Sequence, residues 1–199
     1  MNRKHHVTRG TGLLEEFLSK QRAKLANSKI PSELRSGKIL DIGCGSYPNF
    51  LINTDFNMKY GIESSVNIKD SSERIDLIQF DIEKEESLPF NDNFFNVITL
   101  LAVYEHIDPD RLINVLSEIY RVLKSGGMFI LTTPAPWTDK FLRLLASFNL
   151  VSKEEIDDHK DVYSHKRICN SLVSAGFQKK LIEQGYFEMF LNIWTYAKK

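Results

Sequence analysis

Three acidic residues and a glycine turn stand at or near the ends of apolar runs in the first half of the chain. The stretch KILDIGCGSYPNFL carries Asp41 within its apolar run and turns at Gly43 and Gly45. Glu63 ends the next apolar run, and Asp81 lies at the end of the third. Glycine lets a bound molecule approach the backbone closely because it has no Cβ. The pattern therefore predicts that a small molecule binds where three strands end.

The acids indicate what such a ligand would offer. A carboxylate at the second strand end can accept both hydroxyls of a ribose, and an aspartate at the third can accept the amino group of an adenine. Asp41 suits a cationic amino group, directly or through water, or else holds the backbone of the turn. A dinucleotide fingerprint would need a glycine where this chain has Pro48, and no phosphate-binding Gly-Lys-Ser/Thr motif is present. The ligand expected is an adenosine with a positively charged tail and no pyrophosphate; the alternative is that the acids are solvated strand ends.

Short apolar runs must position these residues. The runs are residues 39–42, 60–63, 75–82, 94–101 and 128–132. Because each is followed by polar or helical sequence, they predict a parallel sheet with helices between its strands. Residues 179–199 contain two β-rich runs and predict a terminal antiparallel hairpin.

Amphipathic patterns predict the helices, which are expected in residues 11–29, 108–127, 137–150 and 164–175. The first would cover the core or close a pocket. The second would pack on the sheet, with Gly126 and Gly127 as its left-handed stop. The fourth has Ser164 as N-cap and Gly176 as terminator.

Length and charge narrow the class of protein. A chain of 199 residues is long enough for one domain with a full hydrophobic core. Lysine plus arginine equals aspartate plus glutamate at 26 each, and the charges are scattered, so no field favours nucleic acid or an anionic membrane. Without an apolar leader or a span of about 18 apolar residues, the protein is expected to be soluble and cytoplasmic. Cys44 and Cys169 lack metal-site spacing, and Cys44 is expected to be a small filler beside the turn.

Five motifs in order resemble those of class I S-adenosylmethionine-dependent methyltransferases. They are ILDIGCGS, Glu63, FDIEKEESLPFNDNFFNVITL, EHI and LSEIYRVLKSGGMFILTTP, and the terminal hairpin extends the likeness to the end of the chain. Within that superfamily the chain is most similar to the small-molecule group that includes ubiquinone-type O-methyltransferases. The resemblance implies an α/β, Rossmann-like fold: a seven-stranded, mostly parallel sheet with helices on both faces and an antiparallel C-terminal hairpin.

The resemblance also implies a cofactor site and a domain plan. S-adenosyl-L-methionine would be held by the glycine turn, by the acids and by the end of the fourth strand, that is by Asp41, Gly43, Cys44, Gly45, Glu63, Asp81, Ile82 and Leu101. Residues 1–199 would form a single domain, with residues 1–36 as a helical cover and residues 37–199 as the cofactor-binding core. An acceptor-pocket insertion is expected near residues 134–163.

Candidate catalytic residues follow the fourth strand, in LLAVYEHIDPD. A hydroxyl acceptor must lose its proton, and His106 is the leading base because histidine exchanges protons near neutral pH; the alternative is that it bonds the backbone. Glu105 would orient His106 or tie loops together, and His159 is the second candidate base. Ubiquinone-type relatives carry a metal-binding glutamate where this chain has Ala102, so no metal is expected.

The acceptor is expected to be a small molecule. Trp137, Phe141, Leu144, Leu145 and Phe148 form an apolar stripe that is either core or a contact to a hydrophobic or lipid-linked acceptor. Nucleic acid is disfavoured because the chain has no Asn-Pro-Pro-Tyr type motif and no basic stripe. The sequence thus predicts methyl transfer to oxygen or nitrogen of a small metabolite; the alternative is a non-catalytic cofactor-binding module.

Overall fold

A seven-stranded mixed sheet forms the centre of the computed structural model, which describes residues 14–64, 75–138, 157 and 160–199. The strand order is β3-β2-β1-β4-β5-β7-β6. The strands are β1 (Lys38–Ile42), β2 (Met58–Glu63), β3 (Ile75–Gln79), β4 (Phe95–Leu101), β5 (Leu123–Pro134), β6 (Ile182–Phe187) and β7 (Asn192–Lys198). β1 to β5 pair in parallel, whereas β7 runs antiparallel to both β5 and β6. The predicted fold class is confirmed.

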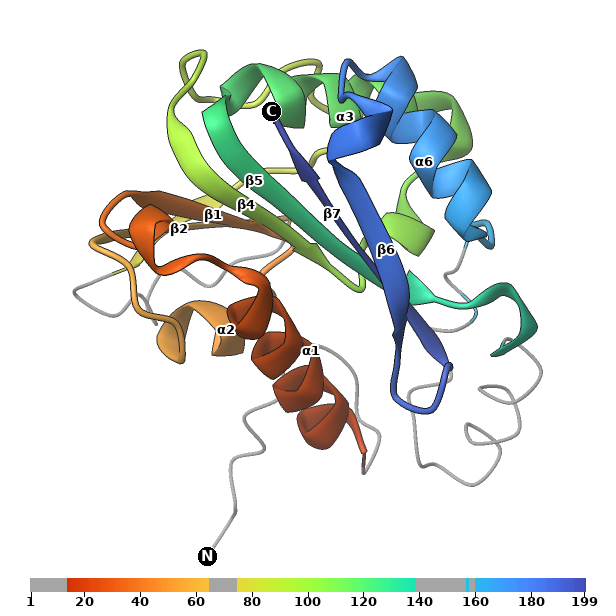
Figure 1. Ribbon diagram of the computed structural model, residues 1–199. Helices are drawn as coiled ribbons and strands as arrows, with labels where there is room; N and C mark the ends of the chain where they lie inside the picture. The colour runs from red at the N-terminus through yellow and green to blue at the C-terminus, as the bar shows by residue number, and fades with distance from the viewer. Residues whose placement is uncertain (1–13, 65–74, 139–156, 158–159) are drawn as a thin grey trace, which may run out of the picture.

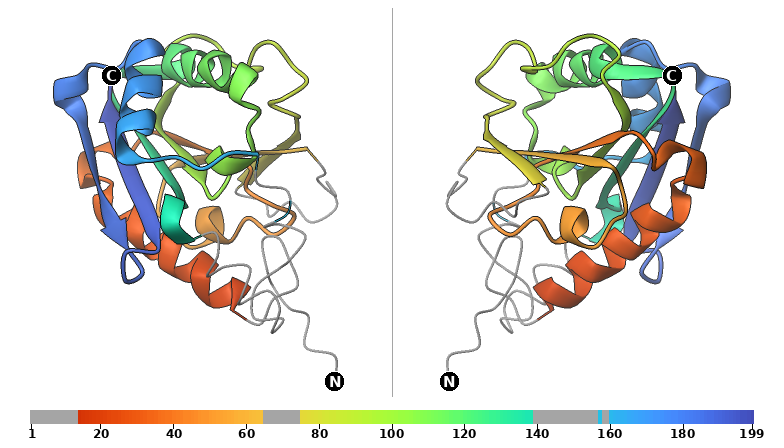
Figure 2. Two further views of the ribbon diagram at one scale, coloured as in Figure 1. Left: turned by 90° about the vertical axis from the view of Figure 1, so that its right-hand side faces the viewer. Right: turned by 90° about the vertical axis from the view of Figure 1, so that its left-hand side faces the viewer.

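Helices cover both faces of the sheet (Figure 1). The α-helices are α1 (Glu15–Lys29), α2 (Asn49–Ile52), α3 (Pro109–Val122) and α6 (His165–Ser174), and short 3-10 helices are η1 (Ser32–Leu34), η3 (Tyr104–His106), η4 (Pro136–Thr138) and η5 (Lys179–Leu181). Figures 1 and 2 show α1 and α2 on one face, and α3 and α6 on the other. Of the described helices, none is long and apolar enough to cross a bilayer.

Alternation along the strands divides the core into two layers. Leu40 and Ile42 of β1 belong to the cluster that contains the buried residues of α3 and α6. Ile39, from the same strand, belongs to the cluster that contains Ala23 and Ala26 of α1. Successive side chains of a strand point to opposite faces, so a strand that is apolar on both sides requires helices on both sides. This requirement explains why Ile39, Leu40 and Ile42 of β1 are all apolar although they face opposite sides of the sheet.

The end of α3 differs from the prediction. The helix begins as expected, with the Asp108 side chain accepting the N–H of Asp110 and with proline at its first position. It ends at Val122, because Leu123 is extended and fully buried at the start of β5. Gly126 has a φ of 77° but lies inside the β5 segment, where the register with β4 shifts. The two glycines therefore do not stop the helix.

Of the other predicted elements, one helix is confirmed, one strand is shorter than predicted, and one helix lies almost entirely outside the described residues. α6 begins at the Ser164 N-cap and is followed by Gly176 with a φ of 110°, as predicted. The third apolar run was predicted to span residues 75–82, but the strand β3 that it forms ends at Gln79. The expected helix at 137–150 lies almost entirely outside the described residues.

Candidate functional site

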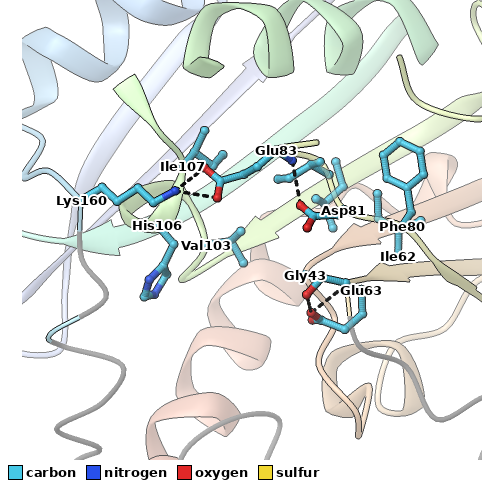
Figure 3. Close-up of a pocket in the computed structure, with 13 residues that line it drawn as sticks. Gly43, Ile62, Glu63, Phe80, Asp81, Glu83, Val103, His106, Ile107 and Lys160 are labelled. Carbon is cyan, nitrogen blue, oxygen red and sulfur yellow. Dashed lines mark hydrogen bonds and ion pairs between the residues drawn. The ribbon is translucent and has the colours of Figure 1, made fainter. Parts of the chain in front are cut away.

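A cavity of about 210 Å³ opens where the carboxyl ends of β1, β2 and β4 meet the turn after β3 (Figure 3). β1 lies between β2 and β4, so the strand order reverses at β1. Ligands of open α/β sheets bind outside the carboxyl ends of the strands at such a point. The lining residues are Ile42, Gly43, Ile62, Glu63, Ser64, Phe80, Asp81, Ile82, Glu83, Val103, His106, Ile107 and Lys160. Five of the sequence-predicted residues, Gly43, Glu63, Asp81, Ile82 and His106, are therefore brought together.

Glu63 fastens the glycine turn. Its carboxylate is buried, and Oε2 accepts the N–H of Gly45 at 2.9 Å. Oε1 accepts both the N–H and the hydroxyl of Ser64, at 2.9 and 3.0 Å. Glu63 also lines the cavity, so a charged acceptor stands at the cavity wall beside the turn that it holds.

The glycine turn itself bends through two left-handed residues. Gly43 and Gly45 have φ values of 71° and 73°, a conformation that glycine adopts without a steric penalty. The N–H groups of Gly43 and Cys44 both donate to the carbonyl of Ile62, at 2.8 and 3.3 Å. Of the three turn residues only Gly43 lines the cavity. Cys44 is buried, and its Sγ lies where a Cβ at Gly61 would stand, so it fills space between β1 and β2.

Asp41 does not line the cavity. Its side chain is 4% exposed, and Oδ1 accepts the hydroxyl of Thr99 on the neighbouring strand β4 at 2.7 Å. Leu101, at the end of β4, packs against the core layer on the α1 side and is also absent from the lining. Together with Cys44 and Gly45, four of the eight residues expected at the cofactor therefore do not line the cavity.

Asp81 lies two residues beyond β3 rather than at its last position. Oδ1 accepts the N–H of Glu83 at 3.0 Å, and Oδ2 pairs with Nζ of Lys84 at 2.9 Å. The hydrogen bond from Lys84 lowers the pKa of the Asp81 carboxyl below its ordinary value, against the opposing effect of burial. Asp81 is therefore an ionised acceptor at neutral pH.

Of the candidate residues after β4, His106 is partly exposed, whereas Tyr104 and Glu105 are buried. His106, in η3, lines the cavity. Glu105 is only 3% exposed and does not line it, and among the described residues its Oε2 has no hydrogen-bond partner. The rings of Tyr104 and Tyr163 meet edge to face at 4.6 Å, and burial raises the pKa of Tyr163 to about 12. Both tyrosines are fully buried members of the core.

Some predictions concern residues outside those described. His159 is one, as are Phe141, Leu144, Leu145 and Phe148 of the apolar stripe. Trp137 is described: its ring is 55% exposed and lies 5.1 Å from that of Tyr186. Over the described ranges, no group of three or more His, Cys, Asp or Glu side chains is arranged to hold a metal ion.

The sequence reasoning missed two charged residues of the cavity wall, Glu83 and Lys160. Glu83 is one of three glutamates in DIEKEE, and nothing in the local pattern separates it from Glu85 and Glu86. Lys160 lies 77 positions away, yet its Nζ contacts both carboxylate oxygens of Glu83 at 2.6 Å. Only the folded chain reveals this pair.

The helix α1 covers the core, as expected, and also contributes apolar side chains to a second concavity. Phe17 is 56% exposed, and it lines a second concavity of about 650 Å³ together with Leu14 and Leu18. Residues of the β6–β7 connection, Met189 among them, form the opposite wall. Small residues of α1, Ala23 and Ala26, pack against the sheet instead. The helix thus covers the core with its alanines and presents its larger apolar side chains to this concavity.

Comparisons with known proteins show the family of the chain. Residues 11–181 match the family model of a methyltransferase domain. The carboxy-S-adenosyl-L-methionine synthase of Campylobacter jejuni is 25% identical over 181 residues, covering 78% of this chain and 76% of that protein. A SAM-dependent methyltransferase from Archaeoglobus fulgidus superimposes with a TM-score of 0.69 at 20% identity, over 94% of this chain and 97% of that one.

A further relative is named as an enzyme that methylates tRNA. The tRNA N(3)-cytidine methyltransferase METTL2 of Gallus gallus is 27% identical over 136 residues, which cover 58% of this chain and 35% of that protein. The chain therefore matches only about a third of the length of that relative. The family match includes the glycine turn, Glu63, Asp81 and His106, all of which fall within residues 11–181.

Proposed function

The chain belongs to the family of methyltransferase domains, and on that premise we propose that it transfers the methyl group of S-adenosylmethionine to an oxygen or nitrogen of a small metabolite. One observation carries the proposal: Glu63, Asp81 and His106, far apart in sequence, line one cavity at the carboxyl edge of the sheet. Two of these side chains suit the cofactor, and the third suits the acceptor.

The cavity residues fit the cofactor by their donor and acceptor chemistry. Glu63 is a buried carboxylate at the cavity wall, a group that suits ribose hydroxyls, and Asp81 is an ionised acceptor for the adenine amino group. Ile82 and Phe80 supply apolar walls of the kind that hold an aromatic base. Gly43 allows close approach to the backbone at the turn. Asp41, which does not line the cavity, would act on the cofactor indirectly by holding the turn.

When bound, S-adenosylmethionine supplies a methyl group already activated by its sulfonium. The protein must then orient an acceptor and, for a hydroxyl, remove its proton. In Figure 3, His106 and Lys160 lie on the opposite side of the cavity from Gly43 and Glu63. His106 would accept the proton, and Val103 and Ile107 beside it would exclude water from that side.

Two kinds of methyl acceptor are supported by different observations: a small metabolite and a base of RNA. The balance of 26 basic and 26 acidic residues supports a small metabolite over RNA, because RNA binding draws on a basic surface. The relative METTL2 supports the second candidate, a nitrogen of an RNA base. The resemblance to the ubiquinone-type group supports the small molecule.

Transfer from labelled S-adenosylmethionine to fractionated cell extract separates the candidates. Label in the fraction below about 1 kDa supports the proposal. Label only in the RNA fraction overturns it in favour of the second candidate. No label in any fraction, from protein that still binds S-adenosylhomocysteine, would favour a non-catalytic module.

Substitution of the candidate bases tests their roles. His106→Ala is expected to lower transfer by about 10²-fold or more, as loss of a general base does, while S-adenosylhomocysteine affinity stays within about two-fold. His165→Ala is the matched control, because His165 lies in α6 beside Gly185 and does not line the cavity. If transfer survives His106→Ala but falls in His159→Ala, then His159 is the base.

A further inference from the structure

Glu83 joins three segments of the chain that surround the cavity. Its Oε1 accepts the N–H of Asp108, at the start of α3, across 2.7 Å. Both of its carboxylate oxygens lie 2.6 Å from Nζ of Lys160, in the segment before α6. Its own N–H donates to Oδ1 of Asp81 at 3.0 Å. Figure 3 shows this chain of contacts running along one wall of the cavity, from Lys160 through Glu83 to Asp81.

Lys160 is held at a second point as well. Its backbone N–H donates to the carbonyl of Glu105 at 2.9 Å. Glu105 directly precedes His106, the candidate base. The lysine therefore connects the segment that carries the candidate base with the turn that carries Asp81.

The Glu83–Lys160 ion pair is partly shielded from solvent. The side chains of Lys160 and Glu83 are 34% and 32% exposed, so water and salt screen their charges only in part. Hydrogen bonds between charged groups are also shorter than neutral ones and about twice as strong. The pair can therefore fix the backbone conformation at Glu83, on which the Asp81 contact depends.

We propose that the Glu83–Lys160 pair positions Asp81, so that its carboxylate is directed at the amino group of the adenine. This inference depends on the cofactor role proposed above for Asp81. Glu83 and Lys160 are positioning residues, because they act through Asp81 rather than on the base itself. Loss of either side chain frees the turn and weakens recognition of the amino group.

Two compounds report on this recognition: S-adenosylhomocysteine and S-inosylhomocysteine, in which a carbonyl oxygen replaces the amino group. Titration calorimetry on the full chain is expected to show that the natural protein prefers the adenosyl compound by about ten-fold or more, since a mismatched polar group is left unpaired. Glu83→Gln and Lys160→Met are each expected to weaken adenosyl binding by about three- to ten-fold and to reduce the preference correspondingly. Lys160→Arg keeps the charge and should retain most of the preference.

Matched controls separate positioning from general destabilisation. Glu86→Gln is the control for Glu83→Gln, because it removes a negative charge from the same loop. Lys166→Met is the control for Lys160→Met, because it removes a positive charge, here from α6. Neither Glu86 nor Lys166 lines the cavity. Both controls should leave the preference unchanged. If one of the two test variants does not fold, the other carries the test.

Each outcome decides between the two proposals. If the natural protein discriminates and both test variants discriminate equally well, the inference is wrong while the cofactor site stands. A lower melting temperature with an unchanged preference would give the pair a structural role only. If the natural protein binds neither compound, the cofactor site fails as well.

Discussion

The carboxylate of Glu63 accepts the backbone N–H of Gly45 across 2.9 Å, although 18 positions separate the two residues. The bond joins the end of β2 to the turn that follows β1. Both strands are parallel neighbours, so their carboxyl ends meet at the same edge of the sheet. One buried side chain therefore shapes the turn and also presents an acceptor to the cavity.

Replacing this carboxylate should affect both stability and cofactor binding. The carboxylate now accepts three hydrogen bonds, from the N–H groups of Gly45 and Ser64 and from the Ser64 hydroxyl. In Glu63→Gln an amide replaces it, whose NH₂ group accepts no hydrogen bond and whose carbonyl carries no charge. The free energy of unfolding is expected to fall by about 1 to 3 kcal/mol. S-adenosylhomocysteine affinity should fall by about ten-fold or more, because a hydrogen bond to a charged group is worth that much.

Calorimetry and chemical denaturation measure the two effects of Glu63→Gln separately. Glu33→Gln is the control, because Glu33 is an exposed residue of η1. A loss of stability with unchanged affinity would show that Glu63 serves only the turn.

Gly61 is a close-packed position on β2. A Cβ there would lie 2.7 Å from Cδ2 of Leu77 and 2.8 Å from Sγ of Cys44. Gly61→Ala is therefore expected to lower the free energy of unfolding by about 1 to 3 kcal/mol, as overpacking does. Denaturant titration of Gly61→Ala, Cys44→Ala and the double variant gives the coupling between the sites. The double variant should be more stable than the sum of the single losses predicts, and strict additivity would contradict the contact.

Ala102 adopts a left-handed conformation, with a φ of 54°, directly after β4. This conformation costs an L-residue about 1 to 2 kcal/mol, whereas glycine tolerates it. Ala102→Gly should leave the free energy of unfolding unchanged or raise it by up to about 1 kcal/mol. Ala175→Gly is the matched control: Ala175 is right-handed, with a φ of −83°, so the same change there should destabilise by about 0.5 to 1 kcal/mol. Equal losses at both positions, measured by denaturant titration, would refute the strain at Ala102.

Glu118 should make stability depend on pH. Its Oε2 accepts the N–H of Leu88 at 2.8 Å, and Arg121 contacts both of its oxygens. Chiefly through Arg121, these bonds lower the pKa of the Glu118 carboxyl below its ordinary value of 4.5. A group whose pKa is lower in the folded state stabilises the fold above its unfolded pKa. That contribution disappears as the pH falls through the folded pKa.

The comparison of Glu118→Gln with the natural protein therefore has a defined pH profile. At pH 7 the free energy of unfolding of the variant should be about 1 to 2 kcal/mol lower than that of the natural protein. The difference should shrink as the pH is lowered from about 5 towards 3, because the natural protein loses its carboxylate there. Denaturant titrations across this range measure it, with the exposed Glu85→Gln as control. A difference that is constant with pH would show that the ionised carboxylate is not the source.

Regular elements were predictable because their signals are local. The apolar runs that became β1, β2 and β4 and the stripe that became α3 follow the periodicity of strand and helix. Their ends were less predictable. α3 stops at Val122 because Leu123 is buried as part of β5, and a burial of this kind depends on neighbours that a local pattern does not reveal.

The sequence alone predicted the class of ligand, since a glycine turn and acids at or near the ends of successive apolar runs indicate which groups a bound molecule would offer. Tertiary structure decided which acid does what. Asp41 turns to Thr99 on β4 rather than to the cavity, and Glu83, rather than Glu85 or Glu86, joins Lys160 from 77 positions away. The physical reason is that a carboxylate takes its role from the donor that folding brings within about 3 Å, and a local sequence pattern does not contain that donor.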